Sequence, residues 1–324
     1  MTGRPGAREL ALLGVGVLAV SLAAPLMASM VVPALAIAFW RNALATCAIA
    51  PVVVTPVVVA RRAAHTDMRM SRESSPGVPA APRATFACPG ARDALLVVLA
   101  GVCLAAHFGF WISSLDLTSV ASSTALVSLQ VVWVVAFDLA RGARVGARLL
   151  FGVLVATVGG VVVGGVDLSL SARALAGDVL ALVGSVAVAA YAVIGGRVRQ
   201  RMRTSTYTLG CYGTAALVLL VAALVAGQSL TGYPSEEWAK LVVLTATAQL
   251  LGHSVFNHLL ATVTPTVVSL ALLLEIPGAA LIAAAWLGQV PSPTAFAGLV
   301  LILAGMAVVV LSMPRIDRTD LSPA

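Results

Sequence analysis

Long apolar stretches recur along nearly the whole chain, and they constrain its fold more than any other feature. A helix needs about 20 apolar residues to cross the hydrocarbon of a bilayer. Only helices and closed barrels satisfy all their backbone hydrogen bonds there. The pattern therefore predicts an all-α polytopic membrane protein with ten transmembrane helices. The expected spans are residues 9–29, 33–60, 93–114, 118–139, 148–166, 177–196, 205–227, 238–261, 265–288 and 293–313.

The composition agrees with a membrane protein. Hydrophobic residues make up 60% of the chain and charged residues only 10%, whereas soluble proteins carry about 25% charged residues. The formal net charge is +7, which by itself would be compatible with a nucleic-acid partner. The placement of the basic residues argues against that interpretation.

The basic residues lie almost entirely in alternate connections between the expected spans. With a cytoplasmic N-terminus, 17 of the 20 Lys and Arg residues lie on the cytoplasmic side and two, Arg173 and Lys240, on the other. The last, Arg41, lies inside a span. We therefore expect a multi-pass protein of the cytoplasmic (inner) membrane of a prokaryote, with both termini cytoplasmic and membrane lipids as partners of the basic residues.

Outside the spans the chain offers little that could fold alone. The segment 61–92 is rich in Pro, Ser, Arg and Ala, lacks apolar periodicity, and is interpreted as a disordered cytoplasmic loop, with a regulatory role as the alternative. Residues 314–324 form a short cytoplasmic tail. The four cysteines, Cys47, Cys88, Cys103 and Cys211, have no metal-binding or redox spacing and are expected to be free thiols.

The two halves of the chain align with each other. The segment 110–130 matches the segment 256–275 at an offset of 145, counted from Trp111 on Phe256, which places Ser119 on Thr264 and Gln130 on Glu275. Residues 151–163 align with 297–309 at an offset of 146 and match two glycines. Because each repeat holds five helices, the second must enter the membrane from the opposite side. We predict inverted repeats at 1–166 and 177–313, an architecture typical of alternating access; a merely enlarged bundle is the alternative.

The same segments resemble the EamA family of the drug/metabolite transporter superfamily over nearly the full length. The similarity is diffuse but keeps its order and spacing, in PALAIAFWRNALA (33–45), HFGFWISSLDLTSVASSTAL (107–126), GDVLALVGSVAVAAYAVIGGR (177–197), FNHLLATVTPTVVSLALLLEIPGAALIAAAWLGQVPSP (256–293) and GLVLILAGMAVVV (298–310). The resemblance implies ten helices in two inverted repeats and export of small metabolites, such as amino acids, or of toxic compounds. The family's frequent Gly-Glu pair after the fourth helix of each repeat is absent, which bears on loop packing near the membrane surface.

Glu275 is the first candidate for a functional residue. A charge at the bilayer centre costs about 2.5–3.5 kcal/mol on insertion scales, so an ionisable residue there is a functional hypothesis. Pro277 cannot donate a backbone hydrogen bond and is expected to open the helix nearby. Glu275 could bind a proton or a cationic substrate group, with Gln130 as its neutral counterpart. A structural glutamate bonded to another helix is the alternative.

Arg41 is the second candidate, because it lies within the span 33–60. Its guanidinium could attract an anionic group such as a carboxylate. It could instead pair with Glu275 or extend toward the membrane surface. Asn42 points to another face and is expected to hydrogen-bond a neighbouring helix.

Two pairs at four-residue spacing share a helix face: His107 with Trp111, and His253 with Asn257. We expect them to line a polar cavity, with ordinary helix packing as the alternative. A metal site is not expected, because the sequence shows no cluster of acidic, thiol or further histidine ligands around them. Tyr191 and His258 are weaker candidates. Gly160 and Gly164 form a small-residue pair that favours close packing, with a homodimer contact as the alternative.

The expected function is secondary transport: export of a small, amino acid-like metabolite or a toxic compound. No nucleotide-binding loop is present and no catalytic constellation or cofactor motif is recognisable, so coupling would come from an ion gradient, with Glu275 as the proton candidate. An uncoupled facilitator or an importer remains open. A membrane-embedded lipid-modifying enzyme and a multi-span sensor are the alternatives from other classes.

Overall fold

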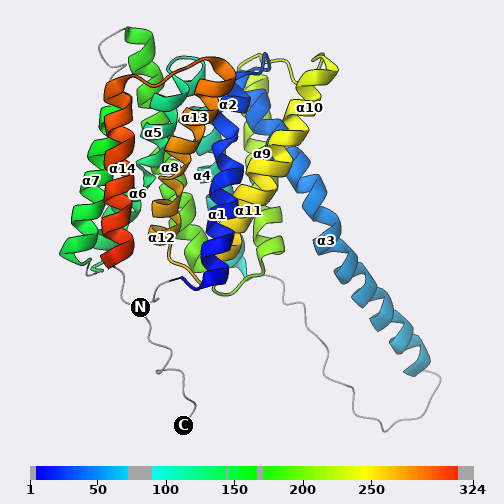
Figure 1. Cartoon of the computed structure of the whole chain (residues 1–324). Coiled ribbons are helices and arrows are strands. Elements are labelled where there is room, and N and C mark those ends of the chain that lie inside the picture. Colours follow the sequence, from blue (N-terminus) through cyan, green and yellow to red (C-terminus); the bar gives the residue numbers. More distant parts are fainter. Residues whose placement is uncertain (1–4, 72–89, 144, 166–170, 313–324) are drawn as a thin grey trace, which may run out of the picture.

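The computed structural model describes residues 5–71, 90–143, 145–165 and 171–312, and every regular element in these ranges is a helix (Figure 1). The elements are α1 (Ala7–Ser21), α2 (Ala23–Ala28), α3 (Ala34–Ser71), α4 (Ala91–Leu115), α5 (Val120–Ser128), α6 (Gln130–Ala140), α7 (Ala147–Gly165), α8 (Ala172–Val198), α9 (Thr204–Val225), α10 (Ser235–Leu244), the π-helix η1 (Thr245–His253), α11 (Ser254–Leu259), α12 (Pro265–Leu272), α13 (Glu275–Leu287) and α14 (Pro293–Ser312).

The helices form a multi-pass bundle whose predicted span boundaries are confirmed to within a few residues in most cases. Eight helical segments in the described part are long and apolar enough to cross a membrane. Two further apolar segments, Ala147–Val163 and Pro293–Val309, are shorter. Consecutive segments run alternately up and down in Figure 1, and α1 begins at the lower end, where α14 finishes.

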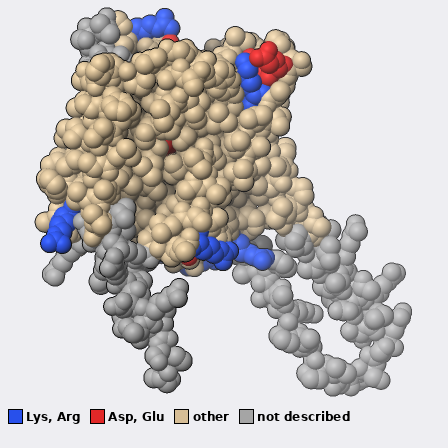
Figure 2. Space-filling view, in the orientation of Figure 1, with Lys and Arg blue, Asp and Glu red and all other residues tan. Residues whose placement is uncertain are grey.

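The outer surface of the bundle matches a lipid environment. Many large apolar side chains are exposed, including Leu18 at 76%, Leu217 at 63% and Leu281 at 67%. Figure 2 shows the charged residues gathered at the upper and lower ends of this face, with an almost uncharged band between them. A contiguous apolar belt of this kind is the surface that faces acyl chains.

Three predicted spans are interrupted inside the bundle. The first breaks at Leu22, between α1 and α2. The fourth breaks at Leu129, between α5 and α6, and the ninth breaks at Leu273 and Leu274, between α12 and α13. The expectation that the helix opens near Pro277 is confirmed, with the break lying a few residues earlier.

The fourth and ninth spans share their capping as well as their break. Ser119 begins α5 by accepting a hydrogen bond from the Ser122 backbone N–H, at 3.1 Å. Thr264 begins α12 by accepting one from the Val267 N–H, at 3.4 Å. These are N-caps, which satisfy backbone donors that have no partner within the helix. Since Ser119 aligns with Thr264, the two halves use the same local chemistry.

Helices α7 and α14 pack through glycines in a pattern that also relates the halves. A Cβ on Gly159 would lie 2.6 Å from the Gly298 carbonyl oxygen, and a Cβ on Gly152 would lie 2.9 Å from that of Gly305. In the alignment of the halves, Gly152 corresponds to Gly298 and Gly159 to Gly305. The contact between Gly159 and Gly298 therefore corresponds to the contact between Gly305 and Gly152. A contact that maps onto itself in this way is typical of two-fold symmetry.

Two expectations are corrected or completed by the fold. Residues 61–71, predicted as part of a disordered loop, continue α3 to Ser71, and α3 extends beyond the bundle (Figure 1). Ala, Arg and Met are favourable helix residues, and the first Pro or Gly after the span comes only at Pro76. Residues 72–89, with Cys88, lie outside the described residues; the other three cysteines are free thiols.

The predicted small-residue pair of the fifth span is used within the chain. Gly160 faces α5, where a Cβ would lie 3.1 Å from a methyl carbon of Leu129 and 3.7 Å from the Ala125 carbonyl oxygen. The surroundings of Gly164 lie outside the described side chains. Close packing of Gly160 therefore agrees with the expectation, and the homodimer remains a prediction.

We predict that Gly159→Ala destabilises the bundle and that the matched variant Gly160→Ala does not. In Gly159→Ala the new methyl group would meet backbone atoms of α14, which cannot move aside, at a cost of about 1–3 kcal/mol. In Gly160→Ala the methyl group would meet only the flexible end of a leucine, and alanine gains helix propensity over glycine. Thermal unfolding in detergent measures both. Equal midpoints for the two variants would contradict the tight α7–α14 contact.

Candidate functional site

A small central cavity lies at the breaks of the fourth and ninth spans. Its volume is about 30 Å³, which holds a water or two and no larger metabolite. The lining residues come from the first, third, fourth, sixth, eighth and ninth spans: Val20, Ala23, His107, Trp111, Val127, Ser128, Gln130, Val188, Ala248, His253, Leu272 and Glu275. Five of the seven residues predicted as site residues therefore lie around one cavity.

Glu275 and Gln130 occupy equivalent places beside this cavity. Each is the first residue of the helix that follows a break, Glu275 in α13 and Gln130 in α6. Their exposed fractions are 7% and 5%. The Oε1 atom of Glu275 has no hydrogen-bond partner among the described residues. A buried carboxylate oxygen without a partner is costly, so the site is prepared for a proton, a water or a ligand donor.

Aromatic rings form the wall opposite these two residues. His107 stacks on Trp111 with ring centroids 5.4 Å apart, and the centroid of His253 lies 6.2 Å from that of His107. The His107 Nδ1 lies 3.1 Å from the Gly184 carbonyl oxygen, which fixes the ring against α8. The indole N–H of Trp111 has no acceptor among the described residues.

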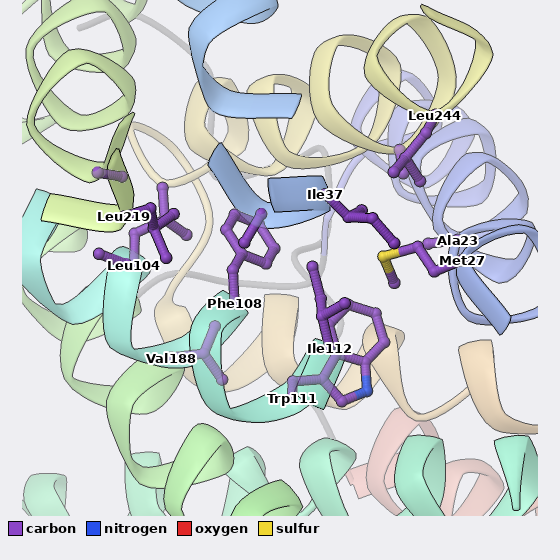
Figure 3. Packing of buried hydrophobic residues seen from close by; sticks show 14 of the residues in the cluster. Ala23, Met27, Ile37, Leu104, Phe108, Trp111, Ile112, Val188, Leu219 and Leu244 are labelled. Carbon is purple, nitrogen blue, oxygen red and sulfur yellow. The ribbon is translucent and has the colours of Figure 1, made fainter. Parts of the chain in front are cut away.

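Arg41 is completely buried, just outside the lining of the cavity. Its Nε donates to Gln249 Oε1 at 2.9 Å, and its guanidinium carbon lies 4.0 Å from the centroid of the Phe108 ring. Such a cation–π contact stabilises a desolvated cation. Its NH2 group has no partner in the described part of the chain. Figure 3 shows Phe108 and Met27, which also contacts Arg41, within the apolar packing of this region.

The structure decides between the alternatives for Arg41. Its burial excludes extension toward the membrane surface. Within the described residues it forms no ion pair with Glu275 at 4 Å or less, although the two charges attract each other through the protein. Arg41 is thus a buried cation held by neutral groups, and a ligand anion would be its natural counter-charge.

Gln249 is the residue that sequence reasoning missed. It lies in the middle of η1, is fully buried, and donates from Nε2 to Asn42 Oδ1 at 3.1 Å. This bond confirms the expected interhelical role of Asn42. A π-helix is rare and often marks a functional site. The sequence does contain a signal for a polar site in this span, namely two threonines and a glutamine among apolar residues.

Asn257 lies apart from the cavity, although it was predicted to share a face with His253. Its Oδ1 accepts from the Tyr191 hydroxyl at 2.6 Å, and its backbone oxygen accepts from Arg199 Nε at 2.8 Å. Asn257 follows His253 through the regular helix α11 and lies one turn farther along it, beside α8, where it contacts Tyr191 rather than the cavity. His258 lies farther out, with Nδ1 3.3 Å from Thr204 Oγ1.

Both ends of the cavity are closed by contacts between distant parts of the chain. At the upper end the backbone N–H of Val31 donates to Glu237 at 3.2 Å, and Lys240 donates to the Ser29 carbonyl at 3.1 Å. At the lower end α1 packs through Leu13 and Val17 against an apolar cluster from α11, α12 and their connection. Entry of a solute therefore requires helices to separate.

The comparisons with known proteins fit this geometry. Residues 175–311 match the model of the EamA-like transporter family. The match confirms the resemblance seen in the sequence and covers the second half, with Glu275, His253, Gln249 and Asn257. Together with the long apolar helices, it indicates a multi-pass membrane protein whose second half is similar to a transporter family. The resemblance of the first half, in residues 33–45 and 107–126, lies outside the matched segment and stays a prediction.

Solved structures add evidence for the fold alone. One, described only as the crystal structure of a protein, has a TM-score of 0.69 and 17% sequence identity, and the alignment covers 96% of this chain and 99% of that one. Nearly the whole chain therefore adopts a fold already seen in a crystal. No curated protein matches the sequence.

We predict energetic coupling between Arg41 and Gln249. Gln249→Leu would leave Arg41 Nε buried without an acceptor, at a cost of about 1–3 kcal/mol. Arg41→Leu removes that donor, so the double variant should be less destabilised than the sum by about 0.5–3 kcal/mol. Unfolding in mixed micelles measures the cycle. Combining Arg41→Leu with Thr157→Val, on α7, should be additive, and additivity in both pairs would contradict the contact.

Proposed function

We propose that the chain is a secondary transporter of the cytoplasmic membrane that exports a small, amino acid-like metabolite or a toxic compound. It works by alternating access between two inverted five-helix repeats, residues 1–166 and 177–313, with ten spans in all. Both termini, including the tail 314–324, lie in the cytoplasm. Glu275 carries the coupling proton, and the ligand binds around the central cavity.

The paired features of the two halves support the inverted repeat. Aligned residues begin α5 and α12, aligned residues follow the breaks, and the α7–α14 glycine contacts exchange with one another. The direction of α5 followed by α6 in Figure 1 is opposite to that of α12 followed by α13. Inverted repeats with broken helices at a central site are typical of secondary transporters.

One observation carries the functional proposal: the buried Glu275 carboxyl oxygen that lines the cavity without a hydrogen-bond partner among the described residues. A structural glutamate would have used both oxygens in bonds to other helices. The same cavity is lined by Gln130, Trp111 and His253, which supply hydrogen-bond donors and acceptors. Arg41 is buried just outside this lining. The Glu275 carboxylate suits a proton or a ligand ammonium, and Arg41 suits a carboxylate.

The closed cavity supports alternating access. In this conformation the cavity has room only for water, and the contacts that close it join the two halves at both ends. A transporter must open one end while the other stays closed. The α2–α3 turn bound to Glu237 and Lys240 at the upper end, and the apolar α1 cluster at the lower end, are the two contacts that we assign to this role.

The direct test is uptake of labelled amino acids, nucleobases and cationic dyes into proteoliposomes, with and without a pH gradient. Gradient-driven accumulation of one class would support coupled transport and identify the substrate class. Flux that follows only the solute's own gradient would favour the uncoupled facilitator or the importer. No flux from verified folded protein would contradict the transport proposal for these classes.

We predict that Glu275→Gln abolishes the response of transport to an imposed pH gradient while leaving the protein folded. The amide keeps the size of the side chain but cannot release a proton at physiological pH. Flux of the substrate found in the panel, measured at equal and unequal pH, checks this. Glu236→Gln, on the exposed upper surface, is the matched control and should behave as the unmodified protein. Normal coupled flux in Glu275→Gln would rule out this role of Glu275.

A further inference from the structure

A second cavity lies on the outside of the bundle, in the surface that faces the membrane. Its volume is about 580 Å³, far larger than that of the central cavity. It runs along α1, α12, α13 and α14, and its wall is almost wholly apolar. On α1 the lining residues follow one helical face: Leu10, Leu13, Gly14, Val17, Leu18 and Ser21. We call this cavity the lateral groove.

The length of the lateral groove matches one leaflet of a bilayer. From Leu10 to Ser21 a helix rises about 16 Å, at 1.5 Å per residue. The hydrocarbon core of a bilayer is about 30 Å thick, so one leaflet contributes about half of that. A groove with this length, open toward the membrane, has the dimensions of a single extended acyl chain rather than those of a compact metabolite.

The two ends of the groove differ, and this fixes the orientation of an occupant. Pro5 lines the groove at its lower end, before the first turn of α1, so this end lies at the membrane surface. At the opposite end the groove stops at Ser21 and Gly278, where α1 and the ninth span are interrupted.

We propose that the lateral groove is a phospholipid-binding site, with one acyl chain along α1 and the headgroup at the lower end of the groove, near Pro5. The bound chain supports α1 against α12 and α13. This seam also separates the groove from the central cavity: Leu274 lines the groove, whereas the next residue, Glu275, lines the cavity. The lipid thereby stabilises the closed lower end. The binding claim does not depend on the transport proposal, since it is tested without flux.

Gly14 makes a clean test possible. A Cβ there would meet nothing within 4 Å, so Gly14→Leu fills the groove without disturbing the core. Ala11→Leu is the matched control, because Ala11 is exposed on the same helix but does not line the groove.

The first measurement is photo-crosslinking of the unmodified protein in nanodiscs with phosphatidylglycerol that carries a diazirine in its acyl chain. We expect peptides of α1, α12 and α14 to be labelled several-fold more than the exposed lipid face of α9. We expect Gly14→Leu to remove this excess and Ala11→Leu to keep it. Uniform labelling of all lipid-facing helices would overturn the proposal.

The second measurement is the melting temperature of detergent-purified protein with and without added phosphatidylglycerol or phosphatidylcholine. Binding to the folded state raises the midpoint. We expect a rise of several degrees in the unmodified protein and in Ala11→Leu and none in Gly14→Leu. Equal rises in Gly14→Leu and Ala11→Leu would overturn the proposal. So would a lipid-independent change of oligomeric state in Gly14→Leu, which would assign the groove to a second copy.

Discussion

Every backbone N–H and C=O group inside a bilayer must find its hydrogen-bond partner within the protein. This requirement governs where the helices of this chain can be broken. The interruptions at Leu129 and at Leu273–Leu274 lie beside the central cavity, surrounded by other helices. Leu129 and Leu273 are buried there, and the first side chain after each break, Gln130 or Glu275, lines the shared cavity. The position of the site thus follows from the solvent in which the chain folds.

The same solvent makes the polar interior expensive. Arg41 has one acceptor in Gln249, one aromatic face in Phe108 and an NH2 group without a partner among the described residues. A network of this kind, only partly satisfied, contributes less to stability than apolar packing would. Its retention beside a carboxylate and two histidines is easier to explain by ligand and proton binding than by folding. The π-helix that carries Gln249 has the same explanation, because a regular helix would position its side chains differently.

Much of this arrangement could be predicted from the sequence. Apolar length located the spans, and the offset of 145 paired Gln130 with Glu275, because both patterns arise from single residues and their neighbours. The π-helix could not be predicted, since the difference between i,i+4 and i,i+5 bonding is decided by packing against α1 and α3. The surroundings of Asn257 could not be predicted either, because a shared helix face does not determine which neighbouring helix each turn meets; Asn257 bonds Tyr191, whereas His253 lines the cavity. The helix at residues 61–71 could not be predicted from the composition of the whole segment 61–92, because its Pro and Ser residues lie after residue 70.

The central claim is that one cavity is reached from each side of the membrane in turn. Ser128→Cys, which lines that cavity, can be tested in vesicles with a membrane-impermeant thiol reagent after Cys47, Cys88, Cys103 and Cys211 are replaced. Ala125→Cys, buried in the apolar core that includes α7 and α14, is the control and should stay unlabelled. The account predicts labelling of Ser128→Cys from either side without an ion leak. Labelling from neither side, or from one side under all substrate and pH conditions, would contradict it.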